Sequence, residues 1–314
     1  MTRLAIACVR LTNPRLRVLV TCDAASHDLL RTHDDPLIEA ADEWIAVRTP
    51  PGPPQFRNRF VKTSIRESVD GPLLLVDSDI VVRGDVAEIF SLKADIACAR
   101  NHSRGVYAEQ LNDRDLSIIL GMDWTINQEV YLNAGVVFLN DTPGARKVAS
   151  EWHRLWLLSH TKFGDCKDQP AFNAALHRVS PKSIILSDKY NAQIKKTPSS
   201  FYGARIWHYY AGYDEMVTNA EVSVAKMLRG SEEMEASDLV ASPHPWRCDS
   251  LVDRLAVYLL NSSNNGERFA GHLLRGQVSS YFASRLLALA RAFEHSLPYG
   301  VRSALRRRLK RPLP

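Results

Sequence analysis

Paired cysteines are absent from this sequence. Its five cysteines are odd in number, lie far apart and include no C-x-x-C motif: Cys8, Cys22, Cys98, Cys166 and Cys248. That pattern excludes a disulfide framework and a zinc site built on paired thiolates. It is typical of a protein from a reducing compartment.

Long apolar runs are also lacking. No stretch approaches the roughly 20 apolar residues that a helix needs to cross a bilayer. Near the amino terminus, Thr2 and Arg3 are followed by only a short apolar stretch before Arg10, which is not the pattern of a secretory signal peptide. We therefore expect a cytoplasmic protein.

Excess positive charge is confined to the carboxyl-terminal segment of the 314-residue chain. The net charge is +5, and six basic residues with no acid among them lie near that end: Arg302, Arg306, Arg307, Arg308, Lys310 and Arg311. The rest of the chain is near neutral, so a nucleic-acid-binding body is not expected, whereas the tail is suited to an anionic surface. Val301, Leu305 and Leu309 share one helical face. We expect either a helix on the inner face of a membrane or a solvated, disordered tail.

Apolar strands and amphipathic helices alternate through the first two thirds of the chain. Strands are predicted at 17–21, 44–47, 73–76, 95–99, 134–139, 183–186 and 205–207, and helices at 57–69, 84–90, 141–158 and 168–177. This alternation predicts an α/β fold with a mainly parallel sheet, in which ligands bind at the carboxyl ends of strands. After about residue 215 the pattern is mostly helical. We expect an α/β domain at 1–215 and a helical region at 216–314.

Two carboxylates follow the most apolar of these strands. The run at 73–76 has the composition of a buried strand, and Asp77, Ser78 and Asp79 come directly after it. Packing gives no reason for two acids at this place. Hard divalent cations take carboxylate oxygens and can be shared with a phosphate, so Asp77 and Asp79 are candidate metal ligands. A solvated turn at the end of a strand is the alternative interpretation.

Three further motifs follow in order along the chain. They are YLNAGVVFLN at 131–140, DQPAFN at 168–173 and IWH at 206–208. With the Asp77–Asp79 motif, the ordered set resembles the retaining nucleotide-sugar transferases of glycosyltransferase family 8 and their relatives with the GT-A fold, over residues 16–213. The resemblance implies a GT-A catalytic domain at 1–215. It also implies a hexosyltransferase that moves a sugar from a nucleotide-diphosphate sugar to a glycan or lipid-linked acceptor.

Site residues are implied by the same resemblance. Asp77, Asp79 and His208 are expected to hold Mn²⁺ or Mg²⁺, a Lewis acid for the diphosphate, and oxygen plus imidazole ligands suit Mn²⁺. Asp168 and Gln169 are expected to face the sugar as catalytic residues. The expected donor-binding residues are Lys62, Asp77, Ser78, Asp79, Asn133, Ala134 and Gly212.

Each of these residues also has a plain structural interpretation. His208 fits a core histidine bonded to backbone, Asp168 a helix cap, Lys62 a solvated helix face and Asn133 a strand start. Only the ordered set of motifs favours the functional interpretation over these.

The sequence departs from the family pattern at several places. Pro170 stands where the family has an aspartate, and Gly212 lies one position late in the closing motif. That motif also lacks the phosphate-binding lysine, for which Lys195 or Lys196 is the substitute to consider. The family begins with a strand that cradles the nucleotide base, whereas residues 4–11 have the pattern of the helix after it. Two alternatives are open: the domain lacks the usual first strand, or its base pocket is built differently.

Two other functions stay open from the residues alone. One is a Mg²⁺-dependent phosphatase of the haloacid dehalogenase type. The first motif of such enzymes is also an apolar strand followed by D-x-D, and Asp77 would then be the nucleophile. Against it, other strands precede the motif, and the segment at 133–140 has no role in such an enzyme. The second alternative is a degenerate GT-A fold that binds ligands without catalysis.

Overall fold

The computed structural model describes residues 2–101, 111–127, 129–193, 203–209, 236–241, 266 and 269–270. By its internal contacts the chain forms two compact units, Met1–Arg247 and Cys248–Pro314, and nearly all described residues belong to the first. The predicted boundary near residue 215 and the basic tail lie outside the described residues, as does most of the predicted helical region. In the described part of the chain, no helix is long and apolar enough to span a membrane.

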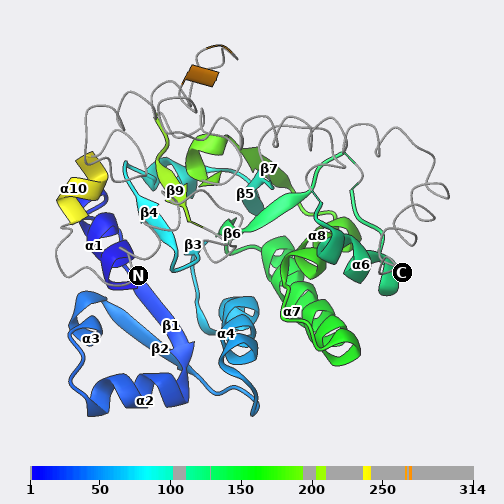
Figure 1. Ribbon diagram of the computed structural model, residues 1–314, viewed down its shortest axis with the longest axis horizontal. Coiled ribbons are helices and arrows are strands. Elements are labelled where there is room, and N and C mark those ends of the chain that lie inside the picture. Colours follow the sequence, from blue (N-terminus) through cyan, green and yellow to red (C-terminus); the bar gives the residue numbers. More distant parts are fainter. Residues whose placement is uncertain are drawn as a thin grey trace. The chain divides into compact units, whose positions relative to one another are not determined.

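Helices and strands alternate along the first unit, as the sequence predicts (Figure 1). In chain order the elements are α1 (Thr2–Thr12), β1 (Leu19–Asp23), α2 (Ala24–Thr32), α3 (Leu37–Ala40), β2 (Glu43–Val47), α4 (Pro54–Ser68), β3 (Leu73–Val76), β4 (Ile80–Val82), the 3-10 helix η1 (Ala87–Ser91), β5 (Ile96–Arg100), α6 (Asp113–Gly121), β6 (Leu132–Leu139), α7 (Pro143–Phe163), α8 (Gln169–Val179), β7 (Ser183–Leu186), η2 (Asp188–Tyr190), β8 (Ala192–Gln193), β9 (Ile206–His208) and α10 (Ala236–Ala241).

The described strands form three sheets with mixed pairing. The largest has the order β3-β6-β5-β7, in which β6 runs antiparallel to both neighbours and β5 runs parallel to β7. The pair β1-β2 is parallel, and β4-β9-β8 contains one antiparallel and one parallel pair. The predicted α/β class is confirmed, but the prediction of a mainly parallel sheet is wrong. An apolar run indicates burial on both faces of a strand and does not fix the direction of its neighbours.

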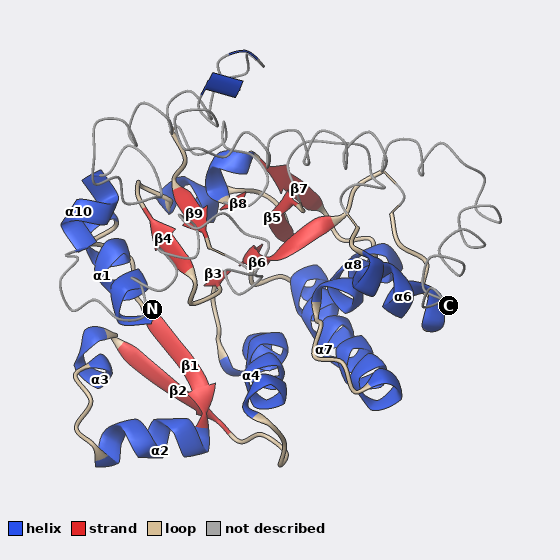
Figure 2. Ribbon diagram, viewed as in Figure 1, coloured by secondary structure: helices blue, strands red, loops and turns tan. Residues whose placement is uncertain are grey.

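Strand β6 is the strand around which the core is built. All eight of its residues are buried. Val137 and Leu139 pack in one apolar cluster with Trp152 of α7, whereas Phe138 belongs to another that contains Ile206 of β9. Each such fully buried side chain contributes about 1.5–3 kcal/mol. Helix α7 also packs against α4 and α8 (Figure 2), so the core holds the strands and helices that carry the site in fixed positions.

Helix α7 begins at Pro143, two residues after the start of the helix predicted at 141–158. Thr142, rather than Asp141, caps the helix, and its Oγ1 accepts a hydrogen bond from the Ala145 N–H at 3.1 Å. Asp141 instead accepts a hydrogen bond from Arg146 and pairs with Arg66. These contacts hold the pKa of Asp141 well below its usual range. The sequence pattern marks a polar cap but does not distinguish between two adjacent capping residues.

Candidate functional site

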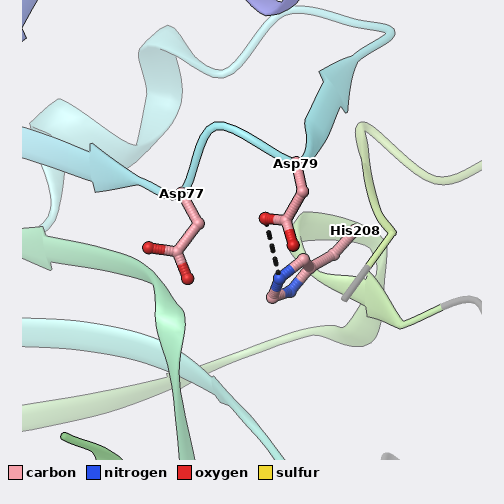
Figure 3. A group of neighbouring side chains, drawn as sticks. All are labelled: Asp77, Asp79 and His208. Carbon is pink, nitrogen blue, oxygen red and sulfur yellow. Dashed lines mark ion pairs between the residues drawn. The ribbon is translucent and has the colours of Figure 1, made fainter. Parts of the chain in front are cut away.

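The turn that joins β3 to β4 carries Asp77 and Asp79. The Asp77 N–H donates to the Gly135 carbonyl of β6 at 2.9 Å, and the Asp79 carbonyl accepts from the Tyr209 N–H at 2.8 Å. The turn is thereby bonded on one side to β6 and on the other to the end of β9. Figure 3 shows the result, with both carboxylates facing the space beside the His208 ring.

Asp77, Asp79 and His208 lie close enough to share one cation. One ligand atom from each residue can be chosen so that all lie within 4.8 Å of one another. His208 Nε2 is 3.5 Å from Asp79 Oδ1 (Figure 3). Apart from that approach, the buried Asp79 Oδ1 accepts no hydrogen bond in the described part of the chain. Two carboxylates and one imidazole fit Mn²⁺ or Mg²⁺, and a divalent ion would compensate the buried carboxylate oxygen.

Lys62 of α4 lies between two of the acidic residues. Its Nζ is 2.8 Å from Asp77 Oδ1 and 3.1 Å from Asp168 Oδ2, and the side chain is only 8% exposed. Arg59, one turn earlier on α4, places its Nε 3.2 Å from Asp168 Oδ1. The solvated-face interpretation of Lys62 therefore does not hold, because this ammonium is buried and paired.

Asp168 precedes α8 but is not a conventional helix cap. Its side chain makes no capping hydrogen bond, and its carboxylate turns toward Lys62 and Arg59. Burial by itself raises the pKa of this carboxyl group, but the two cations outweigh burial and leave the pKa below its usual range. Asp168 is therefore ionised at neutral pH, although it is only 6% exposed.

Gln169 and Asn173 fix the first turn of α8 against the start of β6. Gln169 Oε1 accepts from the Ala134 N–H at 3.2 Å. Asn173 accepts from the Leu132 N–H at 2.8 Å and donates to the Leu132 carbonyl at 2.9 Å. Pro170 is buried in this first turn. A proline is tolerated there because backbone N–H groups in the first turn of a helix have no partner within the helix.

A cleft of about 590 Å³ brings most of the predicted site residues together. The predicted residues that line it are Lys62, Asp77, Asp79, Asn133, Ala134, Asp168, Gln169 and His208. Ser78 is exposed and is not among the lining residues. Gly212, Lys195 and Lys196 lie outside the described residues. Their predicted roles therefore remain predictions.

Other lining residues are not among the predicted site residues. Gln55, Asn58 and Arg59 share one face of α4 with Lys62, and this polar helical stripe is a signal that the sequence does contain. Asp165, Cys166 and Lys167 line the cleft from the loop before α8, and Asn101, Asn112 and Arg114 line it from the segments around β5 and α6.

The small residue Gly135 makes room for a protein side chain. A Cβ atom at this position would lie 2.3 Å from His208 Cε1 and 3.0 Å from His208 Nε2. The family resemblance implies that the donor binds at the neighbouring Asn133 and Ala134. The structure shows that the His208 ring itself occupies the space beside Gly135.

No protein-family model matches the chain, and no curated protein does. Solved structures that resemble it include the glycosyltransferase GlyE of Streptococcus pneumoniae TIGR4, with a TM-score of 0.46 and 18% identity over 76% of this chain and 59% of that one. The galactosyltransferase LgtC, bound to donor and acceptor sugar analogues, has a TM-score of 0.46 and 12% identity over 76% and 94% of the two chains. Apo mouse xyloside xylosyltransferase 1 has a TM-score of 0.44 and 14% identity over 68% and 92%. The chain spans about three fifths of the GlyE chain.

Proposed function

We propose that this chain is a metal-dependent glycosyltransferase that moves a sugar from a nucleotide-diphosphate sugar to an acceptor with retention of configuration. One observation carries the proposal. Asp77, Asp79 and His208 meet at the ends of three strands, inside a cleft that also holds Lys62 and the Asp168–Gln169 pair. This cleft supplies ligands for a divalent cation and a separate polar wall for a sugar.

The charges of the cleft suit a diphosphate donor. Asp77, Asp79 and His208 would hold Mn²⁺ or Mg²⁺, which when bound neutralises charge that develops on the leaving diphosphate. Lys62 and Arg59 add fixed positive charge on the α4 wall, and preorganised charge of this kind stabilises a transition state without reorganisation. We assign donor binding to Lys62 and to the Asn133–Ala134 segment.

The Asp168–Gln169 pair is proposed to face the sugar. Asp168 is an ionised carboxylate at the cleft wall, and Gln169 is anchored to the Ala134 N–H, so both hold fixed positions in the cleft. A fixed amide and carboxylate orient a sugar and stabilise positive charge on its ring. These roles are needed whether retention follows a front-side route or a short-lived ion pair.

The phosphatase alternative fits the structure less well. Its nucleophilic aspartate follows the first strand of its domain, whereas β1 and β2 precede β3 here and β3 is the end strand of its sheet. Asp77 is also bonded to Lys62 and grouped with a histidine, a set that suits a metal ligand. The intact ligand set likewise counts against a degenerate, non-catalytic module.

The acceptor is proposed to be a glycan or a lipid-linked sugar at the inner face of a membrane, with the basic tail as the anchor. The support is the charge of the sequence between 302 and 311. Replacing Arg306, Arg307 and Arg308 with glutamine in the full chain should reduce sedimentation with anionic vesicles and leave donor hydrolysis unchanged. Equal sedimentation of the variant and the wild-type chain rejects the anchor.

A hydrolysis assay tests the proposed activity. Purified protein is incubated with a panel of nucleotide-diphosphate sugars, with and without Mn²⁺, and released nucleoside diphosphate is measured. We expect Mn²⁺-dependent release that the Asp79→Asn variant loses. The matched control is Asp70→Asn, which makes the same chemical change at a carboxylate whose side chain is 95% exposed. Release that persists in Asp79→Asn, or that needs no metal, contradicts the proposal.

A further inference from the structure

A line of buried asparagines lies behind His208. Asn133 Nδ2 donates to Asn101 Oδ1 at 3.1 Å, and Asn191 Nδ2 donates to Asn133 Oδ1 at 2.9 Å. Asn191 Oδ1 in turn lies 2.9 Å from His208 Nδ1. The three asparagines and His208 are each at most 5% exposed. We call Asn101, Asn133 and Asn191 the asparagine chain.

The direction of these hydrogen bonds is fixed by one backbone group. The Gly135 N–H donates to Asn133 Oδ1 at 2.8 Å, and a backbone N–H can only donate, so this atom of Asn133 is the oxygen. The Asn191 group that faces this oxygen must then be its NH₂ group. The other side of the Asn191 amide, its Oδ1, faces His208 and can only accept.

The chain therefore determines which nitrogen of His208 carries the proton. A neutral imidazole has one N–H and one lone pair, and only an N–H can bond to the Asn191 oxygen. Nδ1 is then protonated, and the lone pair is on Nε2, the nitrogen 3.5 Å from Asp79 Oδ1. Gly135 supports the same orientation, because any Cβ at that position would collide with the ring.

We propose that the asparagine chain is a positioning device that holds His208 in the tautomer able to bind a metal through Nε2. Metal-binding histidines commonly donate their other N–H to a neighbouring acceptor, and loss of that partner typically weakens metal binding by 10–100-fold. Here the acceptor is Asn191, a residue that the sequence motifs do not include. The inference deepens the proposed function and rests on it for the metal, but not for the tautomer.

The same contacts give Asn133 a second role. Its oxygen already accepts from Gly135 and Asn191, and its NH₂ group donates to Asn101. The amide therefore acts on His208 through Asn191, in addition to any contact that its position in the cleft wall allows with a donor. Asn101 also lines the cleft, so the asparagine chain connects that wall to the metal ligand.

Three full-length variants test the proposal. Asn191→Ala removes the acceptor, whereas Asn191→Asp keeps an oxygen for the His208 N–H but loses the NH₂ group that donates to Asn133 Oδ1. Asn13→Ala is the matched control, because Asn13 is a buried asparagine that bonds to Gly84 and Val86 away from the cleft. The His208 tautomer is read from ¹⁵N-histidine NMR of the full-length chain, because the two ring nitrogens give distinct signals when only one is protonated. The signal is assigned by its loss in His208→Gln.

Binding of Mn²⁺ alone is measured by water-proton relaxation. We expect the wild-type chain, Asn13→Ala and Asn191→Asp to carry the proton on Nδ1, and Asn191→Ala to lose this single tautomer. Asn191→Ala should bind Mn²⁺ at least tenfold more weakly than Asn13→Ala, with Asn191→Asp recovering most of the loss. A wild-type proton on Nε2, or unchanged Mn²⁺ affinity in Asn191→Ala, overturns the inference. If the wild-type chain has the expected tautomer but binds no Mn²⁺, the proposed metal site fails instead.

Discussion

Lys62 Nζ lies 2.8 Å from Asp77 Oδ1, so an ammonium group of the protein contacts one of the three candidate metal ligands. The same ammonium lies 3.1 Å from Asp168 Oδ2. Lys62 thereby holds together two carboxylates that would otherwise repel each other. The ammonium would repel any cation that binds Asp77, because both are positively charged. An anionic donor in the cleft would replace the carboxylates as its partner.

Removing the Lys62 charge should therefore have opposite effects on two ligands. In Lys62→Met, Mn²⁺ alone should bind at least about fivefold more tightly, because like charges about 4 Å apart repel by about 1 kcal/mol even in bulk water, and this ammonium is buried. Inorganic pyrophosphate, which has the diphosphate without a base, should bind more weakly in the presence of Mn²⁺. Isothermal titration calorimetry measures both, and Lys62→Arg is the charge-conserving control. Weaker Mn²⁺ binding in Lys62→Met contradicts this account of the charge balance.

Gln169 is expected to affect the chemical step more than donor binding. Its side chain is fixed at the cleft wall by the Ala134 N–H, which suits an interaction that strengthens as charge develops on the sugar. Gln169→Ala should lower kcat for donor hydrolysis by roughly 10²-fold, the size of loss seen when one stabilising group is removed. The donor KM should change little. A loss confined to KM argues that Gln169 only binds the donor.

Acid should weaken the Asp168 ion pairs in a defined pH range. Despite its burial, the pKa of Asp168 is lowered by Lys62 and Arg59, so the ionised form stabilises the fold above the unfolded-state pKa of about 3.9. This contribution is lost as the pH falls below that value through the lower folded-state pKa. The free energy of unfolding in urea should therefore differ between wild type and Asp168→Asn at pH 7, and the difference should shrink toward pH 2. A difference independent of pH contradicts the assignment.

Cys166 offers a direct report on occupancy of the cleft. It lines the cleft and is half-buried, whereas Cys8 and Cys98 are fully buried. Burial raises the pKa of all four thiols, to about 12 at Cys8 and Cys98 and about 11 at Cys22, so access to the reagent is what separates them. In a Cys248→Ser background, we expect a thiol reagent to modify Cys166 and Cys22 but not the two buried cysteines. Mn²⁺ with pyrophosphate should slow modification of Cys166. Cys22 lies outside the cleft lining and is the internal control, and equal slowing at both cysteines indicates a general effect on the fold.

Strand-end acids are the part of the site that sequence predicts best. Asp77 and Asp79 stand out because two charged residues follow a continuous apolar run, whereas His208 is predicted only because the IWH segment resembles a family motif. Lys62 is also predicted as a site residue, but its pairing with Asp77 and Asp168 depends on the packing of α4. A linear sequence does not specify that packing.

Asn191 shows why the rest of the site cannot be predicted from sequence patterns. An asparagine after a short turn is ordinary in sequence, and its importance comes only from the strands that place Asn133 and His208 beside it. The direction of β6 is missed for a similar reason. Its eight buried residues indicate burial, but whether a neighbour runs parallel depends on the connections between strands.

The most direct test of the metal site is anomalous diffraction from a crystal of the full chain soaked with Mn²⁺ and pyrophosphate. We expect one strong anomalous peak within about 2–2.5 Å of oxygens of Asp77 and Asp79 and of His208 Nε2. The peak should be absent from crystals of Asp79→Asn prepared in the same way. A peak bound elsewhere, or bound through His208 Nδ1, or no peak in a crystal that contains pyrophosphate, would contradict the central claim that these three residues form the metal site.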